Sequence, residues 1–336
     1  MKKHLALCIL IFIMLASANA QSTSNKINLR LKWAYQAQFA GYLVAQQKGF
    51  YKDAGLDVNI EPGGPDLTPY RNVASGIDDI GIGTISQILT SRSNNLPLVA
   101  IAQIFQDSPN RFVLKGKNRI SSLADLKGKK VGLWMDGDEV EFISMLKTVG
   151  LTLKDVQVVP QKMSIDPFLH DDYVCSQVMV YNELNQIYDS GYKPDQLQII
   201  SPKDYHADIL GDLIFTNQKF LSTHQSQLEE FLSASFRGWK YAKDHPDETA
   251  DIILKYNHTL RRDLQLQQLN AILSLIFLDE TPSKGLGYIN PSDYSNAKQI
   301  MLRGLNPTSA EYKKLSGTNV NSTYTMALWD KVSVVK

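Results

Sequence analysis

The feature that most restricts the possible folds is an alternation of short strands with helices, which starts near the N-terminus and then restarts. Apolar and polar residues alternate over Ile27–Lys32, the pattern of a strand with one buried face. Further strands are predicted at Asp57–Glu61 and Ile80–Ile82, with helical segments between them. Strands that alternate with helices of this length indicate βαβ units and a mainly parallel sheet.

A second set of the same pattern begins after residue 128. Its predicted strands are Lys130–Trp134, Val156–Val159, Ser176–Val180 and Gln198–Ile200. Leu213–Thr216 then looks like a strand that returns to the first set, and the rest is largely helical. We therefore expect an α/β protein of two Rossmann-like lobes with a hinge, joined by crossings near 112–116 and 211–215. Lobe I would comprise residues 24–112 and 214–320, and lobe II residues 113–213.

The first twenty residues have the layout of a secretory signal peptide. Two lysines are followed by the apolar stretch Leu5–Leu15 and by the small-residue cleavage site Ala18–Ala20. We expect residues 1–20 to be removed and the protein to reach the periplasm, so that the mature chain begins at Gln21.

Composition narrows the possible partners. The chain has 336 residues, of which 43% are hydrophobic, enough for a large core. A formal net charge of +1 gives no reason to expect a nucleic-acid partner. Beyond the N-terminal segment no apolar run is long enough to span a membrane. Once Cys8 leaves with the signal, Cys175 is alone, so we expect no internal disulfide and no metal–thiolate cluster.

The loop after the first strand suggests a flat heteroaromatic ligand. Open α/β sheets bind ligands beyond the carboxyl ends of their strands, and clefts between lobes are favoured sites. The candidate residues in this loop are Trp33, Tyr35, Gln36 and Gln38. Their rings can stack on the faces of a ligand, and their amides can donate and accept in its plane. The alternative is that Trp33 and Phe39 fill the core between sheet and helix.

The loop after the third strand adds two candidate binding residues, Thr84 and Ser86. Free N–H groups at the start of the next helix could meet a polar ligand atom. The alternative is that Thr84 only caps this helix together with Gln87, three residues on.

In the second set, Trp134 and Glu139 lie in the loop after its first strand and are candidate binding residues. Asp138 and Glu141 have the spacing of a helix cap, so we interpret Glu141 as structural.

Tyr181 and Glu183 follow the strand Ser176–Val180. Tyr181 can stack on a ring, and Glu183 can accept two N–H donors from an aminopyrimidine edge. The alternative for Glu183 is an acid in the first helical turn, where the helix dipole favours it.

No catalytic arrangement stands out. The histidines beyond the signal segment are His170, His206, His224, His245 and His258, and their spacing matches no metal motif. No Gly-x-Ser-x-Gly elbow and no P-loop occurs. Cys175 precedes an apolar strand and is interpreted as a core residue. We predict a monomer with no catalytic residue, metal or cofactor.

Several segments carry a family resemblance. They are Leu31–Trp33 with Gln36–Tyr42, Lys48–Val58, Leu123–Gly132, Val180–Leu184 and Gly238–Ala242. The first two segments resemble the opening of periplasmic binding proteins for thiamine pyrimidine precursors, to which fungal hydroxymethylpyrimidine phosphate synthases are related. The third is similar to a segment of many class II solute-binding proteins. The resemblance covers about Ile27 to Leu278.

The resemblance implies a type II periplasmic binding protein with a hinged cleft, which delivers its ligand to an ABC permease in the inner membrane. It also implies that Trp33, Tyr181 and Glu183 contact a hydroxymethyl- or formylamino-pyrimidine. The fungal synthases carry a cysteine-rich iron motif and consume their own histidine beside a lysine-bound cofactor. One mature cysteine and a signal peptide favour binding over catalysis. The alternatives are a pyrimidine synthase-like enzyme and a ligand-sensing module for a membrane kinase.

Overall fold

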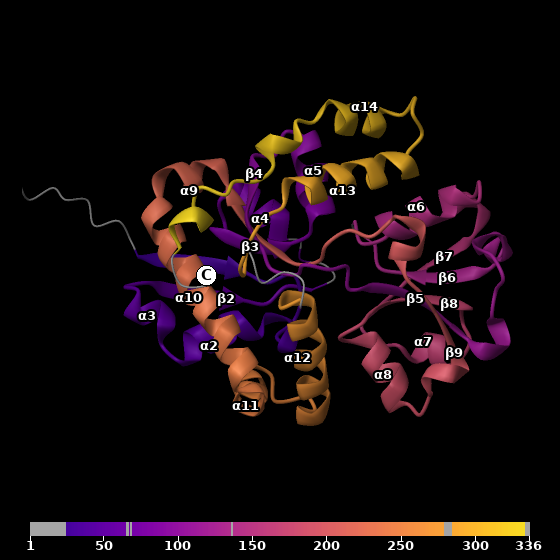
Figure 1. The fold of residues 1–336 in the computed structure, drawn as a ribbon, viewed down its shortest axis with the longest axis horizontal. Coiled ribbons are helices and arrows are strands. Elements are labelled where there is room, and N and C mark those ends of the chain that lie inside the picture. Colours follow the sequence, from indigo (N-terminus) through magenta and orange to yellow (C-terminus); the bar gives the residue numbers. More distant parts are fainter. Residues whose placement is uncertain (1–24, 65–66, 68, 136, 279–283, 333–336) are drawn as a thin grey trace, which may run out of the picture.

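Two sheets, each at the centre of its own lobe, organise the molecule (Figure 1). The computed structural model describes residues 25–64, 67, 69–135, 137–278 and 284–332. Within these residues each sheet has five strands. The expected α/β architecture of two lobes is confirmed, whereas the expected signal peptide lies outside the described residues.

The first sheet has the order β2-β1-β3-β10-β4. Its strands are β1 (Lys26–Arg30), β2 (Asp57–Glu61), β3 (Ile80–Gly83), β4 (Leu98–Gln103) and β10 (Leu213–Asn217). Strand β1 pairs in parallel with β2 and β3, and β10 runs antiparallel between β3 and β4. The returning strand expected at Leu213–Thr216 is therefore confirmed.

The second sheet repeats this order as β7-β6-β8-β5-β9. Its strands are β5 (Asn110–Lys115), β6 (Lys130–Leu133), β7 (Gln157–Pro160), β8 (Cys175–Met179) and β9 (Leu197–Ile200). Strand β5 is antiparallel to β8 and β9. Cys175 is buried, and burial raises the pKa of its thiol to about 12, as befits a core residue.

The chain crosses between the sheets twice. It leaves β4 at Gln103 and enters β5 at Asn110. A crossing was expected at residues 112–116, but residues 112–115 belong to β5 instead. It returns between Ile200 and Leu213, and the expected crossing at 211–215 overlaps the end of this segment. We call residues 104–109 and 201–212 the first and second crossing segments.

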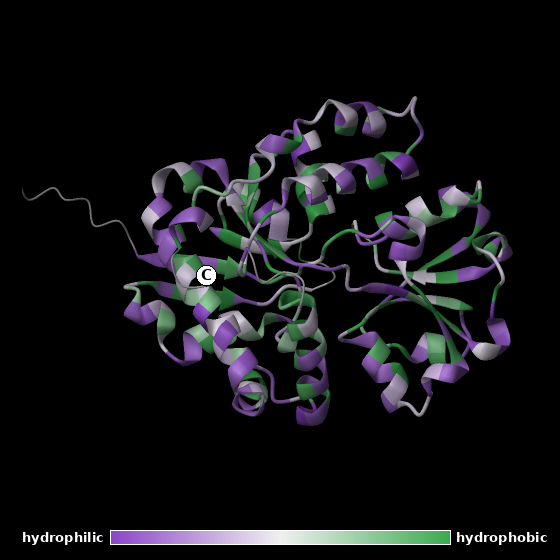
Figure 2. Cartoon of the chain, viewed as in Figure 1, coloured by the Kyte–Doolittle hydropathy of each residue, from purple (hydrophilic) through white to green (hydrophobic). Residues whose placement is uncertain are grey.

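Helices cover both sheets, with their apolar faces turned inward (Figure 2). The first lobe carries α2 (Ala40–Gln47), α3 (Phe50–Asp53), α4 (Pro69–Ser75), α5 (Ile85–Ser93), α9 (Gln218–Thr223), α10 (Gln225–Asp244), α11 (Pro246–Tyr256), α12 (Arg262–Ile276), α13 (Pro291–Gly304) and α14 (Ala310–Gly317). The second lobe carries α6 (Val140–Thr148), α7 (Asp166–Leu169) and α8 (Glu183–Asp189). The helical C-terminal part is thus confirmed.

Helices α2 and α10 cross at very short range because glycines meet at the contact. A Cβ atom on Gly238 would lie 1.9 Å from the carbonyl oxygen of Gly41. On the other side, a Cβ on Gly41 would lie 2.3 Å from the indole ring of Trp239, which is fully buried. No side chain larger than hydrogen fits at either position.

One hydrophobic core continues from the first lobe into the second. Phe142 and Met145 of α6 belong to the same buried cluster as Tyr294 and Ile300 of α13. Helix α13 spans the boundary between the lobes in Figure 1. A Cβ on Gly304 would lie 2.7 Å from Ile143, so the two helices are in close contact at the end of α13.

Glu141 joins the two crossing segments. Its carboxylate accepts hydrogen bonds from Ser108 Oγ (2.8 Å) in the first crossing segment, from Asn110 Nδ2 at the start of β5, and from the Ile209 N–H (2.5 Å) in the second crossing segment. Burial raises the pKa of Glu141 to about 8, although these three hydrogen bonds act in the opposite direction. The helix-cap interpretation of Glu141 is wrong: α6 begins after Glu139 without a side-chain cap, and Glu141 points into the hinge.

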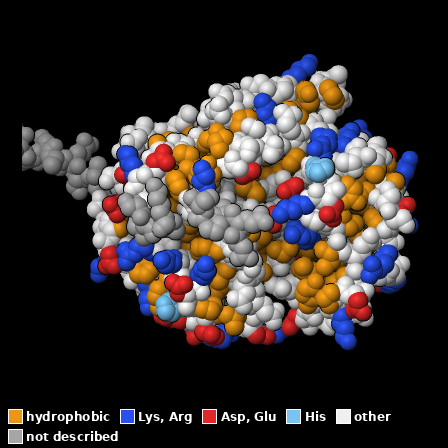
Figure 3. Space-filling model, in the orientation of Figure 1, with side chains coloured by type: hydrophobic (Ala, Val, Ile, Leu, Met, Phe, Trp, Pro, Cys, Tyr) orange, Lys and Arg blue, Asp and Glu red, His pale blue; other side chains and the backbone are white. Residues whose placement is uncertain are grey.

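The face of the molecule drawn in Figure 3 has no large patch of one charge, because lysines and arginines are interspersed with acidic side chains. Among the described residues, no helix is both long and apolar enough to cross a membrane.

Candidate ligand-binding cleft

The loop after β1 forms one wall of a cavity between the lobes. Gln36 and Gln38 are buried, and Gln36 Nε2 donates to Gln38 Oε1 (2.8 Å). Gln38 Nε2 donates in turn to Asp212 Oδ2 (2.7 Å) on the second crossing segment. From α12, Gln268 accepts from the Ala37 N–H (3.0 Å) and donates to Gln36 (3.3 Å). This wall is therefore held by hydrogen bonds from distant parts of the chain.

Aromatic rings from both lobes line this cavity. Trp33 of the first lobe and Trp134 of the second meet edge to face, with their ring centroids 5.5 Å apart. Tyr181 also lines the cavity, and its ring packs edge to face against Phe105. Three rings at one cavity provide surfaces on which a flat ligand can stack.

Glu183 supplies the acceptor group of the cavity. Its Oε2 accepts from the Met179 N–H (2.8 Å) and its Oε1 from Asn182 Nδ2 (2.6 Å), so its orientation is fixed. Each oxygen retains capacity for a second donor. Burial raises the pKa of Glu183, while these hydrogen bonds and the charge of Lys32 act against the rise.

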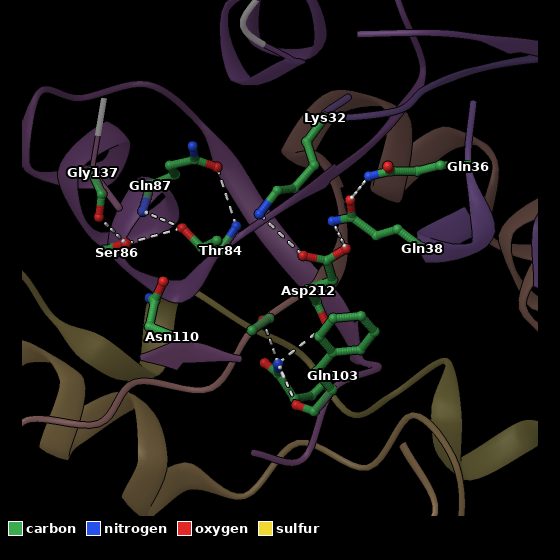
Figure 4. A network of polar contacts seen from close by, with 12 residues as sticks. Lys32, Gln36, Gln38, Thr84, Ser86, Gln87, Gln103, Asn110, Gly137 and Asp212 are labelled. Atoms are coloured by element: carbon green, nitrogen blue, oxygen red, sulfur yellow. Dashed lines mark hydrogen bonds and ion pairs between the residues drawn. The ribbon is translucent and has the colours of Figure 1, made fainter. Parts of the chain in front are cut away.

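A second cavity adjoins the first, and Asp138 and Met179 line both. Its walls include Lys32, two residues beyond the end of β1, and Thr84 and Ser86, at the start of α5. Figure 4 shows Lys32 pointing at Asp212, whose Oδ1 lies 3.2 Å from its Nζ. Burial acts to lower the pKa of Lys32, but Asp212, Asp138 and Glu183 outweigh it and raise the pKa to about 12.

Direct contacts bridge the two lobes across the cleft. Ser86 Oγ donates to the Gly137 carbonyl (3.1 Å), as Figure 4 shows. Gln268 Nε2 donates to Asn182 Oδ1 (3.2 Å). At the surface, Arg261 of the first lobe pairs with Asp189 of the second at 2.6 Å. The structure is therefore a closed arrangement of the lobes.

The structure brings most of the predicted site residues together. Those that line the two cavities are Trp33, Gln36, Gln38, Thr84, Ser86, Trp134, Tyr181 and Glu183. The expected capping box of Thr84 with Gln87 is confirmed, so Thr84 is a cap and also a cavity residue. Phe39 is fully buried in the core.

Two predicted residues lie elsewhere. The Tyr35 hydroxyl donates to the Ile60 carbonyl (2.8 Å), and its ring packs against Tyr256. Glu139 accepts from the Gly137 N–H (2.8 Å) and lines a separate groove beside α13 and α14.

Several cavity residues were not predicted from the sequence. The residues that lie in or directly behind the cleft without having been predicted there are Lys32, Asp138, Met179, Asn182, Asp212 and Gln268. One signal was available, because a lysine is unusual at the end of a half-buried strand, and Lys32 ends the predicted first strand. Among the described residues, no group of three or more His, Cys, Asp or Glu side chains is placed to hold a metal ion.

Two α/β lobes of this strand order, joined by two crossings and enclosing a cavity, define the periplasmic binding protein fold. A solved protein of Bordetella bronchiseptica superposes with a TM-score of 0.73 at 17% identity, covering 92% of this chain and 96% of the other. The nitrate-binding protein of Synechocystis gives a TM-score of 0.67 at 13% identity, over 93% and 89%. The chain belongs to the NMT1/THI5-like family, whose model matches residues 36–249.

The curated relatives include both binding proteins and enzymes. A Haemophilus influenzae protein named for thiamine biosynthesis is 29% identical, over 86% of this chain and 90% of its own. The riboflavin-binding protein RibY of Chloroflexus aurantiacus is 24% identical (84% and 82%), and the formylaminopyrimidine-binding protein of Halalkalibacterium halodurans is 22% identical (79% and 83%). A Candida albicans 4-amino-5-hydroxymethyl-2-methylpyrimidine phosphate synthase is 24% identical (73% and 76%).

Proposed function

We propose that the chain is the periplasmic solute-binding protein of an ABC importer and binds a thiamine pyrimidine precursor, of the hydroxymethyl or formylamino type, in the cleft between its lobes. The observation that carries this proposal is the combination of Trp33, Trp134 and Tyr181 with the oriented carboxylate of Glu183 at one cavity. Rings would stack on the faces of the pyrimidine, and Glu183 would accept its N–H groups.

The chemistry of the cleft favours binding over the synthase alternative. A lysine that forms a covalent bond with a carbonyl must first lose its proton. With a pKa of about 12, Lys32 keeps its proton at neutral pH. The histidines of the described residues lie outside both cavities, and Cys175 is buried in the second sheet.

The export signal, the ABC permease partner and the monomeric state form part of the same proposal. A sensory module for a membrane kinase would use the same cleft, and the neighbouring genes distinguish the two. Permease genes support transport, and a kinase gene supports sensing.

Glu183→Gln tests the ligand chemistry. The amide replaces one acceptor with a donor, so affinity for hydroxymethyl- and formylamino-pyrimidine should fall roughly ten- to a hundredfold. Calorimetric titration measures this change. Glu230→Gln, at an exposed position of α10, is the matched control and should bind as the wild type does.

Trp33→Ala should also weaken binding, through the loss of a stacking surface worth about 0.5–1.5 kcal/mol beyond area burial. Unchanged affinity of Glu183→Gln would remove Glu183 from the site. Failure of the wild type to bind either pyrimidine would contradict the proposed ligand.

Ligand binding should close the lobes. The Ser86–Gly137 and Gln268–Asn182 bonds exist only when the lobes meet, and a ligand that touches both lobes stabilises this state. Small-angle X-ray scattering should give a smaller radius of gyration with ligand than without. Identical curves at saturation would argue against a hinge.

A further inference from the structure

The second cavity has an unusual charge balance. Of the described residues that line the two adjoining cavities, Lys32 is the one cation, whereas Asp138 and Glu183 are acids. A third acid, Glu141, is largely protonated at neutral pH because burial raises its pKa to about 8. Lys32 is also already paired, because Asp212 Oδ1 lies 3.2 Å from its ammonium group. No positive charge is left over for a ligand, and the cleft carries a surplus of negative charge.

Asp138 is the acid best placed to meet a ligand. It lines both cavities at the point where they join. Its backbone carbonyl accepts from Gln177 Nε2 (2.7 Å), which holds the residue in place, whereas its carboxylate has no hydrogen-bond or ion-pair partner within the described part of the chain. Its charge acts on Lys32, Tyr181 and Asp212, so it lies among the groups of the cleft.

We propose that the second cavity is a subsite for a donor-bearing substituent of the ligand, such as an amino, amide N–H or hydroxyl group, with Asp138 as its acceptor, and that it excludes phosphate monoesters. This inference rests on the proposed binding function and specifies the ligand class. A phosphate would bring negative charge next to the carboxylates of Asp138 and Glu183, and like charges at short range repel each other.

Two hydroxyl groups that line the same cavity as Asp138 are already hydrogen-bonded within the protein. The hydroxyls of Thr84 and Ser86 lie 2.9 Å apart, and Ser86 donates onward to the Gly137 carbonyl. Thr84 is also engaged with Gln87 in the capping box of α5. These groups are committed to structural hydrogen bonds, which leaves the Asp138 carboxylate as the acceptor available to a substituent.

The experiment uses two pairs of compounds that differ only by phosphorylation. The first pair is 4-amino-5-hydroxymethyl-2-methylpyrimidine and its phosphate, and the second is riboflavin and its 5′-phosphate. In calorimetric titrations of the mature protein, the unphosphorylated member of a pair should bind at least about a hundredfold tighter than its phosphate. Asp138→Asn should weaken the unphosphorylated compound about tenfold and reduce the preference. Asp195→Asn, exposed in the same lobe, is the matched control.

Each outcome decides a separate point. Equal or tighter binding of a phosphate, or an unaltered preference in Asp138→Asn, would overturn the inference. A preference for riboflavin over its phosphate with no binding of the pyrimidines would support the inference and contradict the pyrimidine proposal. Binding of none of the four compounds would contradict both. Because the Asp138 carboxylate makes no hydrogen bond within the protein, the melting temperature of Asp138→Asn without ligand should stay at the wild-type value and confirm that it folds.

Discussion

Gly238→Ala should lower the free energy of unfolding by about 3 kcal/mol or more, at or above the usual range for overpacked sites. The added methyl group would lie 1.9 Å from the carbonyl oxygen of Gly41 and 3.0 Å from the Cβ of Ala45. A backbone carbonyl inside a helix cannot rotate away as a side chain can, so α2 and α10 would have to separate. Their separation would also loosen the packing around Trp239, which is buried at the same crossing.

Urea denaturation followed by circular dichroism measures this loss, with Gly317→Ala as the matched control. Gly317 ends α14, and a Cβ there meets no atom within 4 Å. The control should be neutral or slightly stabilising, because alanine restricts the unfolded chain more than glycine does. Equal stability of the two variants would show that the α2–α10 contact is looser than the structure indicates.

Glu141→Gln should destabilise the hinge by roughly 1–3 kcal/mol, the usual cost of leaving a buried polar group unpaired. If the amide oxygen keeps the Ser108 and Ile209 hydrogen bonds, the amide nitrogen faces Asn110 Nδ2, and two donors oppose each other. Asn110 cannot turn over freely, because its Oδ1 accepts from Gln177 Nε2 (3.0 Å). One buried hydrogen bond is therefore lost in either arrangement.

The cost should depend on pH. The pKa of Glu141 is raised from 4.5 to about 8 in the folded protein, so the folded state binds a proton that the unfolded state has released. The stability linked to this proton is fully present below pH 4.5 and is lost as the pH rises through about 8. The difference in free energy of unfolding between wild type and Glu141→Gln should be largest near pH 5. By pH 9 it should vanish or change sign, because the wild type alone loses on the order of a few kcal/mol over this range.

Urea denaturation at both pH values tests this expectation, with Glu230→Gln as the exposed control, whose effect should be small at either pH. A difference that grows between pH 5 and pH 9 would mean that Glu141 is ionised throughout and stabilised by its three donors.

Local patterns were sufficient for most of the fold. Strand β2 has its predicted bounds, Asp57–Glu61, because the alternation of apolar and polar residues is a short-range signal. A crossing between the lobes was predicted at residues 112–116, where the structure has β5. Nothing in the residues of β5 shows that it lies between β8 and β9. Its position depends on strands that come later in the chain.

Some cavity residues, too, follow from local sequence, whereas others depend on contacts with distant parts of the chain. Trp33, Tyr181 and Glu183 were predictable because each follows a strand, where parallel sheets place their ligand-binding loops. Asp212 could not be predicted from the sequence. Its place at the cleft depends on contacts with Lys32 and Gln38, which are far away in sequence. Tyr35 has the right residue type in the right loop, but the Ile60 carbonyl turns its hydroxyl away from the cavity.

The position of β10 between β3 and β4 bears on how the newly made chain folds. During synthesis, β3 and β4 emerge long before Leu213–Asn217, so the facing edges of these two strands stay unpaired until β10 has been made. The strands of the second sheet lie between residues 110 and 200 and can pair as soon as they have emerged. The side of α6 that carries Ile143 stays uncovered until α13 arrives, because Ile143 packs beside Gly304 at the end of α13. A nascent chain that stalls before Pro291 would leave this face exposed and would therefore be prone to aggregate.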